Sequence, residues 1–451
     1  MSNERIMTKS NSLTRRQFVQ TAAVAGAGMM MPFAARAQEA AGAKEDELAV
    51  GFIGPGSQGR WLMNKCLKIP GVRFVSICDI WPYHREYAAN ILKKYDQIVT
   101  TYEDYREMLD KEQNLDAVIV ATPDWAHAEH AIACLKAGRH VYCEKEMANT
   151  IESAKQMVLA ARETGNLLQI GHQRRSNPWY FHALKLIEKD KILGRITHCN
   201  GQWNRAQLFE LGFPKGRELD DDTLKKYGYA SMDEFRNWRW YRKFSGGPMA
   251  DLGSHQIDVF NWFLGTRPKT VLASGGLDFY TEQKDRDWYD NVLTIYEYDT
   301  PAGPVRAFYQ ILNTTSHGGF FETFMGNEGS LTVSEVPEKN LMFREKAAKR
   351  REWEDEAAKV ESMGRDAIEL KIGETLTPEG EKTEEAQQML AEAKKPPHQL
   401  HLENFFNAIR KGTPLNCPAE LAFEVCVSVL HANDAVESGC RYEFSPDDFK
   451  V

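Results

Sequence analysis

The sequence predicts an α/β protein of two domains: an N-terminal doubly wound parallel sheet, then an α+β domain with a large, mostly antiparallel open sheet. Two observations lead to this prediction. Between residues 47 and 170, continuous apolar runs alternate with helix-length segments, which is typical of a parallel sheet covered on both faces. Between residues 171 and 451, consecutive runs alternate apolar and polar residues, which is typical of antiparallel strands with one covered face.

The expected strands of the first domain are short and rich in Val, Ile and Phe. They are LAVGFIG from residue 48, VRFVSICD from residue 72, LDAVIVATP from residue 115 and HVYCEK from residue 140. Helices are expected between them, over residues 60–68, 83–95 and 126–138. This alternation of strands and helices indicates βαβ units.

The second domain contains several expected strands close together in sequence. They are GRITHCNGQWN, KTVLASGGLDFY, NVLTIYEYD, VRAFYQILN and GSLTVSE. Residues 336–397 are highly charged and poor in apolar periodicity, so they are predicted to form a solvated insertion. Residues 398–439 are predicted to form two amphipathic helices that pack back towards the first domain.

The first 37 residues have the composition of an export signal. Arg15 and Arg16 precede a short apolar run, TAAVAGAGMMMPFAA, and small residues stand at Ala35 and Ala37. These features indicate a cleaved secretory signal, and the paired arginines indicate the twin-arginine route. A disordered amphipathic tail is the alternative. We therefore expect a periplasmic protein with a linker over residues 38–46.

Charge and cysteine content argue against several kinds of partner. Residues 1–37 carry five basic residues and one acidic residue, so the net charge of −8 becomes −12 for the remaining chain. A strongly negative chain is not expected to bind nucleic acid or an anionic membrane. The eight cysteines show no C-x-x-C spacing, and the acidic run Asp220–Asp222 has no accompanying ligand residues. No metal site is therefore predicted.

The segment GFIGPGSQGR contains a dinucleotide-binding signature. Gly54, Gly56 and Gly59 have G-x-G-x-x-G spacing between an expected strand and an expected helix. The first glycine permits a tight turn, the second lets a pyrophosphate approach the backbone, and the third allows close packing of helix on strand. Asp79 ends the second strand, where a carboxylate can bind a ribose diol and repel a 2′-phosphate. The sequence therefore predicts NAD rather than NADP, with a turn that binds no ligand as the alternative.

Two further stretches carry chemically active side chains. HVYCEKEMANT places Lys145 between Glu144 and Glu146 directly after a strand, at the sheet edge where doubly wound proteins bind ligands. GGPMADLGSH places Asp251 and His255 at positions i and i+4 of an expected helix, so the carboxylate can orient the imidazole as a general base. The alternatives are surface ion pairs of Lys145 with its neighbouring acids and of Asp251 with His255.

Taken together, the glycine turn, AGRHVYCEK, GGPMADLGSH and FFNAIRKGTPL resemble the glucose–fructose oxidoreductase / inositol dehydrogenase (Gfo/Idh/MocA) family. The resemblance runs from about Leu48 to Gly439 and is weakest over residues 336–397. It implies a Rossmann domain followed by a mostly antiparallel α/β domain whose open sheet mediates homodimers or homotetramers. It also implies hydride transfer between NAD and a carbon of a sugar or polyol.

The resemblance further implies the roles of individual residues. His255 would accept the hydroxyl proton, Asp251 would orient His255, and Lys145 would polarise the carbonyl. The residues expected around the cofactor are Gly54, Gly56, Ser57, Gln58, Gly59, Asp79, Thr122, Pro123, Trp125, His127, Glu144 and Lys145. Aromatic rings beside polar and cationic groups suit a saccharide. The residues expected around the substrate are Glu146, His172, Arg174, Arg175, Tyr180, Trp238, Trp240 and Tyr241, with core positions as the alternative for the tryptophans.

One residue departs from the family pattern. Family members usually read Glu-Lys-Pro, and this chain has Glu146 in place of that proline. A proline favours an extended conformation in the preceding residue, so its loss relaxes the backbone around Lys145. A carboxylate that points inward would also favour the charged ammonium. We therefore expect Glu146 to tune Lys145 or to contact the substrate.

The expected function is NAD-dependent oxidation of a sugar or glycoside, with the C3 hydroxyl of a glucoside as a candidate position. Because free NAD is scarce outside the cytosol, we expect a tightly bound cofactor that a second, carbonyl-bearing sugar recycles. One alternative is a redox-assisted glycoside hydrolase, although family relatives with that activity usually carry a THG-like stretch in place of DLGSH. The other alternative is a non-catalytic protein that binds nucleotide and sugar.

Overall fold

A computed structural model describes residues 47–451 apart from residues 207–208, 283–285, 350, 352–353, 355–356, 363, 371 and 373–383. Residues 47–451 form one compact unit. The predicted export signal and linker lie outside the described residues. Within the described residues, no helix has both the length and the apolar character that crossing a membrane requires.

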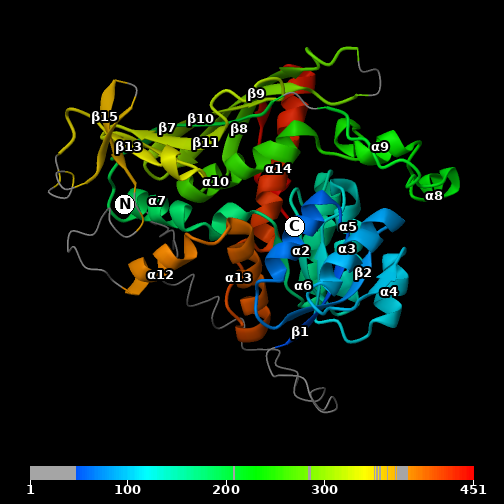
Figure 1. The fold of residues 1–451 in the computed structure, drawn as a ribbon. Helices are drawn as coiled ribbons and strands as arrows, with labels where there is room; N and C mark the ends of the chain where they lie inside the picture. The colour runs from blue at the N-terminus through cyan, green and yellow to red at the C-terminus, as the bar shows by residue number, and fades with distance from the viewer. Residues whose placement is uncertain are drawn as a thin grey trace, which may run out of the picture. The chain divides into compact units, whose positions relative to one another are not determined.

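The N-terminal domain has the predicted doubly wound parallel sheet (Figure 1). Its strand order is β3-β2-β1-β4-β5-β6, so the order reverses between β1 and β4, where such sheets bind ligands. The strands are β1 (Leu48–Ile53), β2 (Val72–Cys78), β3 (Thr100–Tyr102), β4 (Ala117–Val120), β5 (His140–Cys143) and β6 (Leu168–Ile170). The helices are α2 (Ser57–Cys66), α3 (Pro82–Lys93), α4 (Tyr105–Lys111), α5 (Asp124–Lys136) and α6 (Ile151–Thr164).

The described part of the second domain contains the predicted large sheet, with strand order β14-β15-β13-β12-β11-β7-β10-β9-β8-β16. Among the described strands, neighbouring strands pair antiparallel, except that β7 pairs parallel with β10. The central strands are β7 (Ile196–Asn204), β8 (Pro268–Gly276), β9 (Asn291–Thr300), β10 (Gly303–Leu312), β11 (Phe320–Gly326) and β12 (Gly329–Val333). At its ends lie β13 (Leu341–Arg344), β14 (Lys359–Ser362), β15 (Arg365–Glu369) and β16 (Tyr442–Glu443).

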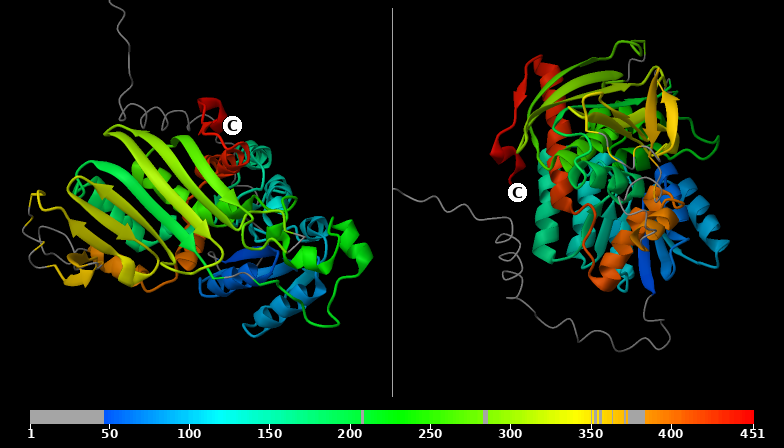
Figure 2. Two further views of the ribbon diagram at one scale, coloured as in Figure 1. Left: turned by 90° about the horizontal axis from the view of Figure 1, so that it is seen from above. Right: turned by 90° about the vertical axis from the view of Figure 1, so that its left-hand side faces the viewer.

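One face of the large sheet is covered by helices. Tyr296, Tyr298 and Tyr309 point into a core that also contains residues of α7 (Pro178–Glu188), α10 (Ser254–Leu264) and α14 (Ala419–Ser438). Figure 2 shows the strands side by side with these helices on one face. The period-2 alternation of the strands therefore separates a covered face from a second face.

Two C-terminal helices join the domains. α13 (Pro397–Lys411) contributes Leu402, Phe405 and Phe406 to the core of the parallel sheet. α14 contributes one side to the core of the large sheet and another, including Cys426, to the core around β4 and β5. Because each helix shares a core with the parallel sheet, and α14 also with the large sheet, they help to fix the second domain against the first.

Residues 336–397 differ from the predicted solvated insertion where the structure describes them. β13, β15 and β14 extend the large sheet, and Met342, Ile368 and Leu370 are buried in its core. Apolar runs here are no longer than three residues and stand among charged ones, so no long apolar run marks these strands in the sequence. η5 (Pro337–Lys339) and α12 (Glu384–Glu392) are the helical elements described in this segment.

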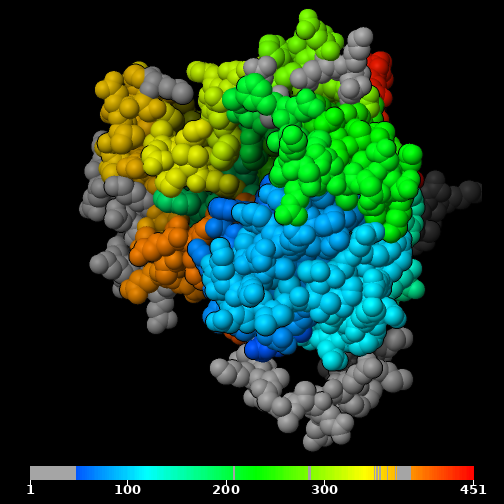
Figure 3. Space-filling model, turned by 45° about the vertical axis from the view of Figure 1, so that its right-hand side comes forward, coloured from blue at the N-terminus to red at the C-terminus, as the bar shows by residue number. Residues whose placement is uncertain are grey.

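The segment between β7 and α10 lies over the Rossmann domain, as the green surface on blue in Figure 3 shows. Its apolar residues, including Leu224, Tyr229 and Phe244, pack around Trp81 at the start of α3. The short elements here are α8 (Asp221–Lys226), α9 (Met232–Arg236) and η3 (Trp238–Trp240). The remaining short helices are η2 (Gln173–Ser176), the π-helical turn η4 (Met249–Gly253) and η6 (Pro446–Phe449).

Candidate active site

The glycine turn between β1 and α2 has the geometry that a dinucleotide requires. Gly54 has φ of 85°, which favours glycine, and a Cβ on Gly59 would lie 2.2 Å from the Gly54 carbonyl oxygen. A Cβ on Gly56 would meet only His84, at 3.6 Å. Gly56 is the N-cap of α2, and no side chain caps that end, so Ser57 and Gln58 present backbone N–H groups there. The turn therefore leaves room for a pyrophosphate beside the second glycine.

Asp79 stands at the end of β2, as predicted. Its Oδ1 accepts a hydrogen bond from the Trp81 backbone N–H at 2.8 Å, and its Oδ2 lies 3.0 Å from Nδ1 of His84. Each carboxylate oxygen has a second lone pair, so the group can still accept bonds from a ribose diol. The carboxylate is held in place by its own domain before any cofactor binds.

The other predicted cofactor residues lie at the ends of β4 and β5. Pro123 is the N-cap of α5, and Trp125 donates from Nε1 to the Tyr229 hydroxyl at 3.3 Å. His127 lies with Nδ1 2.7 Å from the Glu146 carbonyl oxygen and Nε2 2.7 Å from the Thr122 carbonyl oxygen. His127 thereby fixes the loop after β5 to the end of β4, which is a structural contribution to the site.

Lys145 lies in a cluster of charges with Asp251. Its Nζ donates to the Asp251 carbonyl oxygen and lies 3.8 Å from Oδ1 of that residue. Arg205 and Arg239 also hold the Asp251 carboxylate, at 3.2 and 3.1 Å. Burial alone would raise the pKa of Asp251, but Arg239, Arg205 and Lys145 outweigh it and hold the pKa well below its ordinary value. Asp251 is therefore a permanent anion that positions three cations.

The predicted contact between Asp251 and His255 is not formed. Asp251 lies in the π-helical turn η4, where its carboxylate pairs with Arg205 and Arg239, whereas His255 lies in α10. Nδ1 of His255 is buried and has no hydrogen-bond partner among the described residues. Its ring packs against Trp203, with centroids 5.3 Å apart. Burial, reinforced by Lys145, lowers the pKa of His255 well below its ordinary value, so the imidazole is neutral and can accept a proton.

Three buried carboxyl groups surround the backbone of Lys145. Burial raises the pKa of Asp124 to about 6, of Glu144 to about 7 and of Glu146 to about 8. Glu144 accepts from Nε2 of Gln58 at 3.4 Å, and a Cβ on Gly171 would lie 3.1 Å from its carboxylate. Two of these acids, Glu144 and Glu146, follow β5 almost directly, and their side chains are buried inside the protein.

The side chain of Glu146 points into the core rather than towards the pocket described below. Oε1 accepts from the Met147 backbone N–H at 2.7 Å, and Oε2 is buried with no hydrogen-bond partner among the described residues. The Lys145–Glu146 peptide bond is cis. The inward orientation is one of the two arrangements that the sequence predicted for Glu146.

Replacing Glu146 with Gln is expected to flatten the pH dependence of unfolding free energy between about pH 5 and pH 8. Because burial raises the pKa of Glu146 to about 8, the folded chain keeps a proton that the unfolded chain loses at about pH 4.3. Stability is therefore full below the unfolded pKa and falls as pH rises through the folded pKa, by up to about 1.4 kcal/mol per pH unit. Urea denaturation at several pH values measures this. The exposed Glu163→Gln variant is the control and should follow the native curve, and an unchanged slope in Glu146→Gln would contradict the assignment.

Most residues predicted around the substrate are buried behind the site. Arg174 pairs with Glu322, and the Tyr180 hydroxyl donates to the same carboxylate at 2.7 Å. Arg175 donates to Asp258 at 2.7 Å. The remaining members are His172, which is fully buried, and Trp238 and Tyr241, which pack in the cluster around Trp81. The structure does not bring these residues to the pocket beside Asp251, whereas it does bring Trp240 there.

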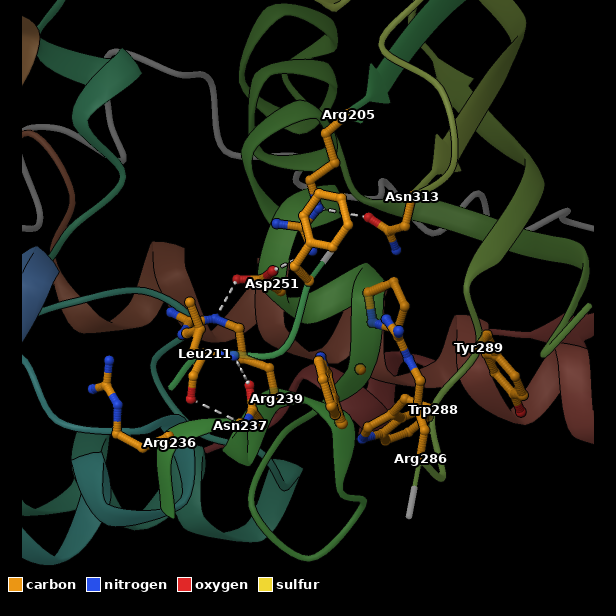
Figure 4. A pocket seen from close by; sticks show the side chains of 14 residues that line it. Arg205, Leu211, Arg236, Asn237, Arg239, Asp251, Arg286, Trp288, Tyr289 and Asn313 are labelled. Atoms are coloured by element: carbon orange, nitrogen blue, oxygen red, sulfur yellow. Dashed lines mark hydrogen bonds and ion pairs between the residues drawn. The ribbon is translucent and has the colours of Figure 1, made fainter. Parts of the chain in front are cut away.

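The pocket beside Asp251 has a volume of about 270 Å³ (Figure 4). Sequence analysis identified two of its residues, Asp251 and Trp240, and missed the arginines, because they come from separate loops and share no motif. The other lining residues are Arg205, Phe209, Leu211, Arg236, Asn237, Arg239, Gly247, Pro248, Arg286, Trp288, Tyr289 and Asn313. Lys145 is not a lining residue of this pocket, but it contacts the lining residue Asp251.

A Rossmann domain with an open glycine turn and a Lys at the end of β5, joined to a second domain whose helical segments supply an Asp and a neutral His, defines a dinucleotide-binding protein of the oxidoreductase type. Two models of one family match the chain: "Oxidoreductase family, NAD-binding Rossmann fold" over residues 48–172 and "Oxidoreductase family, C-terminal alpha/beta domain" over residues 223–442. The chain belongs to the Gfo/Idh/MocA oxidoreductase family, as its sequence predicted, and its N-terminal domain is an NAD-binding domain.

Individual relatives match only part of the chain. Inositol 2-dehydrogenase of Salmonella typhimurium is 29% identical over 228 residues, 50% of this chain and 56% of the relative. The 2,7-anhydro-N-acetylneuraminate hydratase of Escherichia coli is 30% identical over 162 residues, 36% of this chain and 37% of the relative. The chain spans about half the length of the curated relatives it matches.

Solved structures share the fold over most of the chain. The WlbA dehydrogenase from Bordetella pertussis, in complex with NADH and UDP-GlcNAcA, has a TM-score of 0.63 at 18% identity, covering 88% of this chain and 98% of that chain. At this identity the likeness shows the fold alone.

Proposed function

We propose that the protein is an NAD-dependent dehydrogenase that oxidises a hydroxyl carbon of a sugar or glycoside. The observation that carries this proposal is the position of Lys145, which ends a strand of the NAD-binding sheet and reaches Asp251 in the pocket of the second domain. The site residues fit NAD, because the turn at Gly56 is open and Asp79 stands ready for a ribose. When bound, NAD supplies the hydride acceptor.

The chain's own residues would then accept the hydroxyl proton and stabilise the negative charge on the reacting oxygen. The Lys145 ammonium can donate a hydrogen bond to the reacting oxygen and stabilise negative charge that develops on it. His255 packs against Trp203 and its imidazole is neutral, so the imidazole can take the hydroxyl proton. Asp251 does not contact His255, so its role is to position Lys145 and the two arginines.

The finer predictions from the sequence remain part of this proposal. They are oxidation at C3 of a glucoside, and a tightly held cofactor that a second sugar recycles. A redox-assisted reaction is the second candidate, because one relative is named as a hydratase, a reaction with no net oxidation. The presence of Lys145, Asp251 and His255 together, with Lys145 in contact with Asp251, favours an enzyme over a binding protein.

We expect the protein purified without added cofactor to carry NAD that a particular sugar reduces. The measurement is absorbance near 340 nm and the matching fluorescence, before and after addition of glucosides and free sugars. Reduction without release would support internal recycling, and a cleaved or hydrated product without net reduction would support the second candidate. Bound NAD that no sugar reduces or converts would contradict both.

Assembly and export are also proposed. Leu272 and Ile295 are opposite each other on neighbouring strands and are 45% and 41% exposed, which suits a homo-oligomer formed through the large sheet. A mass measurement in solution tests this proposal. The paired arginines at residues 15 and 16 support export to the periplasm, which fractionation of cells that produce the native chain or an Arg15→Lys, Arg16→Lys chain would test.

A further inference from the structure

Arg236 is a cation of the second domain that lies on the cofactor side of the site. It ends α9, and its guanidinium carbon lies 5.2 Å from the ring centroid of Trp81. Trp81 is the N-cap of α3, and its backbone N–H donates to the Asp79 carboxylate at 2.8 Å. Figure 4 shows Arg236 at the edge of the pocket, away from Arg286. Arg236 therefore lies beside the place where the adenosine half of NAD is expected.

The segment that carries Arg236 is held firmly against the Rossmann domain. Trp81 is 1% exposed, and its Nε1 donates to the backbone carbonyl oxygen of Arg217 at 2.5 Å. The side chain of Arg217 pairs with Glu86 of α3 at 2.9 Å. Lys226 of α8 pairs with Glu103, which follows β3, at 2.8 Å. Because these contacts join the two domains, they fix the position of α9 relative to the glycine turn.

The terminal nitrogens of Arg236 can bind a ligand. Nε donates to the carbonyl oxygen of Gly212 at 3.2 Å, and the two Nη groups form no hydrogen bond or ion pair with the described residues. The indole ring of Trp81 and the bond from Nε hold the plane of the guanidinium. A planar guanidinium in a fixed orientation matches the oxygens of a phosphate through paired N–H donors.

A second guanidinium approaches this place from the first domain. Arg60 lies in the first turn of α2, and its Nη1 donates to the carbonyl oxygen of Pro55 in the glycine turn at 3.0 Å. Burial lowers the pKa of Arg236, Arg60 lowers it further, and Asp79 raises it. Two guanidinium groups of different domains therefore share the field of one carboxylate. A negatively charged pyrophosphate at the glycine turn would compensate the second of them.

The other charged side chains of this region do not take the place of that pyrophosphate. Glu86 and Glu103 already form the ion pairs given above. Neither Asp233 nor Glu234, the acids of α9, shifts the pKa of the guanidinium at the end of that helix. Arg85 is a further cation, and its Nη1 donates to a backbone carbonyl oxygen at 2.5 Å. Among the described residues, no acid forms an ion pair with the α9 guanidinium.

We propose that Arg236 binds the pyrophosphate of NAD from the second domain, so that the cofactor is held between the glycine turn and α9. The inference rests on the NAD site of the proposed function and adds a binding residue that lies outside the glycine motif. The backbone N–H groups at the start of α2 would bind the pyrophosphate from one side, and Arg236 would bind it from the other. The 2′-phosphate of NADP shares this chemistry, and the experiment separates the two.

Titrations of the full chain and of Arg236→Gln test the inference. Nicotinamide fluorescence gives the affinities for NADH and NADPH, and displacement of the bound NADH gives those for ADP and adenosine. We expect Arg236→Gln to bind NADH and ADP at least about tenfold more weakly, because a charge-assisted hydrogen bond is worth this much. Its affinity for adenosine should be unchanged, since adenosine has no phosphate. Arg236→Lys should restore only part of the loss, because an ammonium lacks the planar pair of donors.

Arg217→Gln is the matched control from the same segment. It removes the exposed ion pair with Glu86 but keeps the backbone carbonyl oxygen that Trp81 contacts, so its affinity for NADH should change by less than about fivefold. An equal loss in Arg217→Gln would show that docking of the segment sets the affinity, and it would overturn the assignment. A native affinity for NADH in Arg236→Gln would also overturn it.

The ligands locate the contact on the cofactor. Equal losses for ADP and adenosine in Arg236→Gln would place the guanidinium on the adenine, and a loss confined to NADPH would place it on the 2′-phosphate. Either result would overturn the pyrophosphate assignment. These titrations need no sugar, so they are independent of the proposed reaction. A protein that binds NADH through Arg236 but oxidises no sugar would uphold this inference and contradict the dehydrogenase.

Discussion

Replacing Lys145 with Met is expected to lower kcat by about 10²–10⁴-fold while NAD stays bound. Lys145 is the ammonium at the end of β5, and it lies 3.8 Å from Oδ1 of Asp251. Met has a similar length and no charge, so it can donate no hydrogen bond to a reacting oxygen. Asp251 keeps its contacts with Arg205 and Arg239, so the second domain should remain folded. The measurement is single-turnover reduction of bound NAD by the sugar that the native protein oxidises.

Two further variants distinguish chemistry from folding. Lys145→Arg keeps the charge in a different shape and should not restore the rate, because a guanidinium cannot replace a compact ammonium on a crowded strand end. Lys111→Met removes an exposed lysine paired with Glu107 and should leave kcat, NAD content and Tm unchanged. Full turnover by Lys145→Met would show that another group stabilises the charge on the reacting oxygen, and the proposed role of Lys145 would be wrong.

The cofactor side of the site could be predicted from local sequence. Gly54, Gly56 and Gly59 act within one turn, so their spacing alone defines their geometry, and the structure places each where the motif requires. The strand ends at Asp79 and Lys145 follow from continuous apolar runs, which buried parallel strands require. The local sequence determines these positions, and contacts between distant segments contribute little to them.

The substrate side could not be predicted in the same way. Spacing of i and i+4 suggested that Asp251 holds His255, but the Asp251 carboxylate pairs instead with Arg205 and Arg239, which come from distant or unpatterned segments. Arg205, Arg239 and Arg286 meet only after the second domain folds, and each stands alone in its own segment. Arg174, Arg175 and Tyr180 looked like binding residues because of their chemistry, whereas the structure buries them against Glu322 and Asp258.

Replacing Gly56 with Ala is expected to abolish tight NAD binding without destabilising the chain stripped of cofactor. Gly56 has φ of −64°, which any residue adopts, and its Cβ would meet only His84 at an ordinary 3.6 Å. The added methyl group would instead occupy the space that a pyrophosphate needs. Gly59→Ala is the matched comparison, because its Cβ would lie 2.2 Å from the Gly54 carbonyl oxygen. That variant should lose about 1–3 kcal/mol of stability as well as the cofactor.

Thermal denaturation of the stripped proteins and titration with NAD separate the two effects. Gly56→Ala should have the Tm of the native stripped chain and an affinity for NAD lower by at least about tenfold, whereas Gly59→Ala should fall in both. Comparing stripped proteins matters, because bound NAD raises Tm by mass action and would otherwise hide the difference. Native-like NAD affinity in Gly56→Ala would place the cofactor away from this turn. The proposal that NAD binds at the glycine turn and reacts near Lys145 and Asp251 would then be wrong.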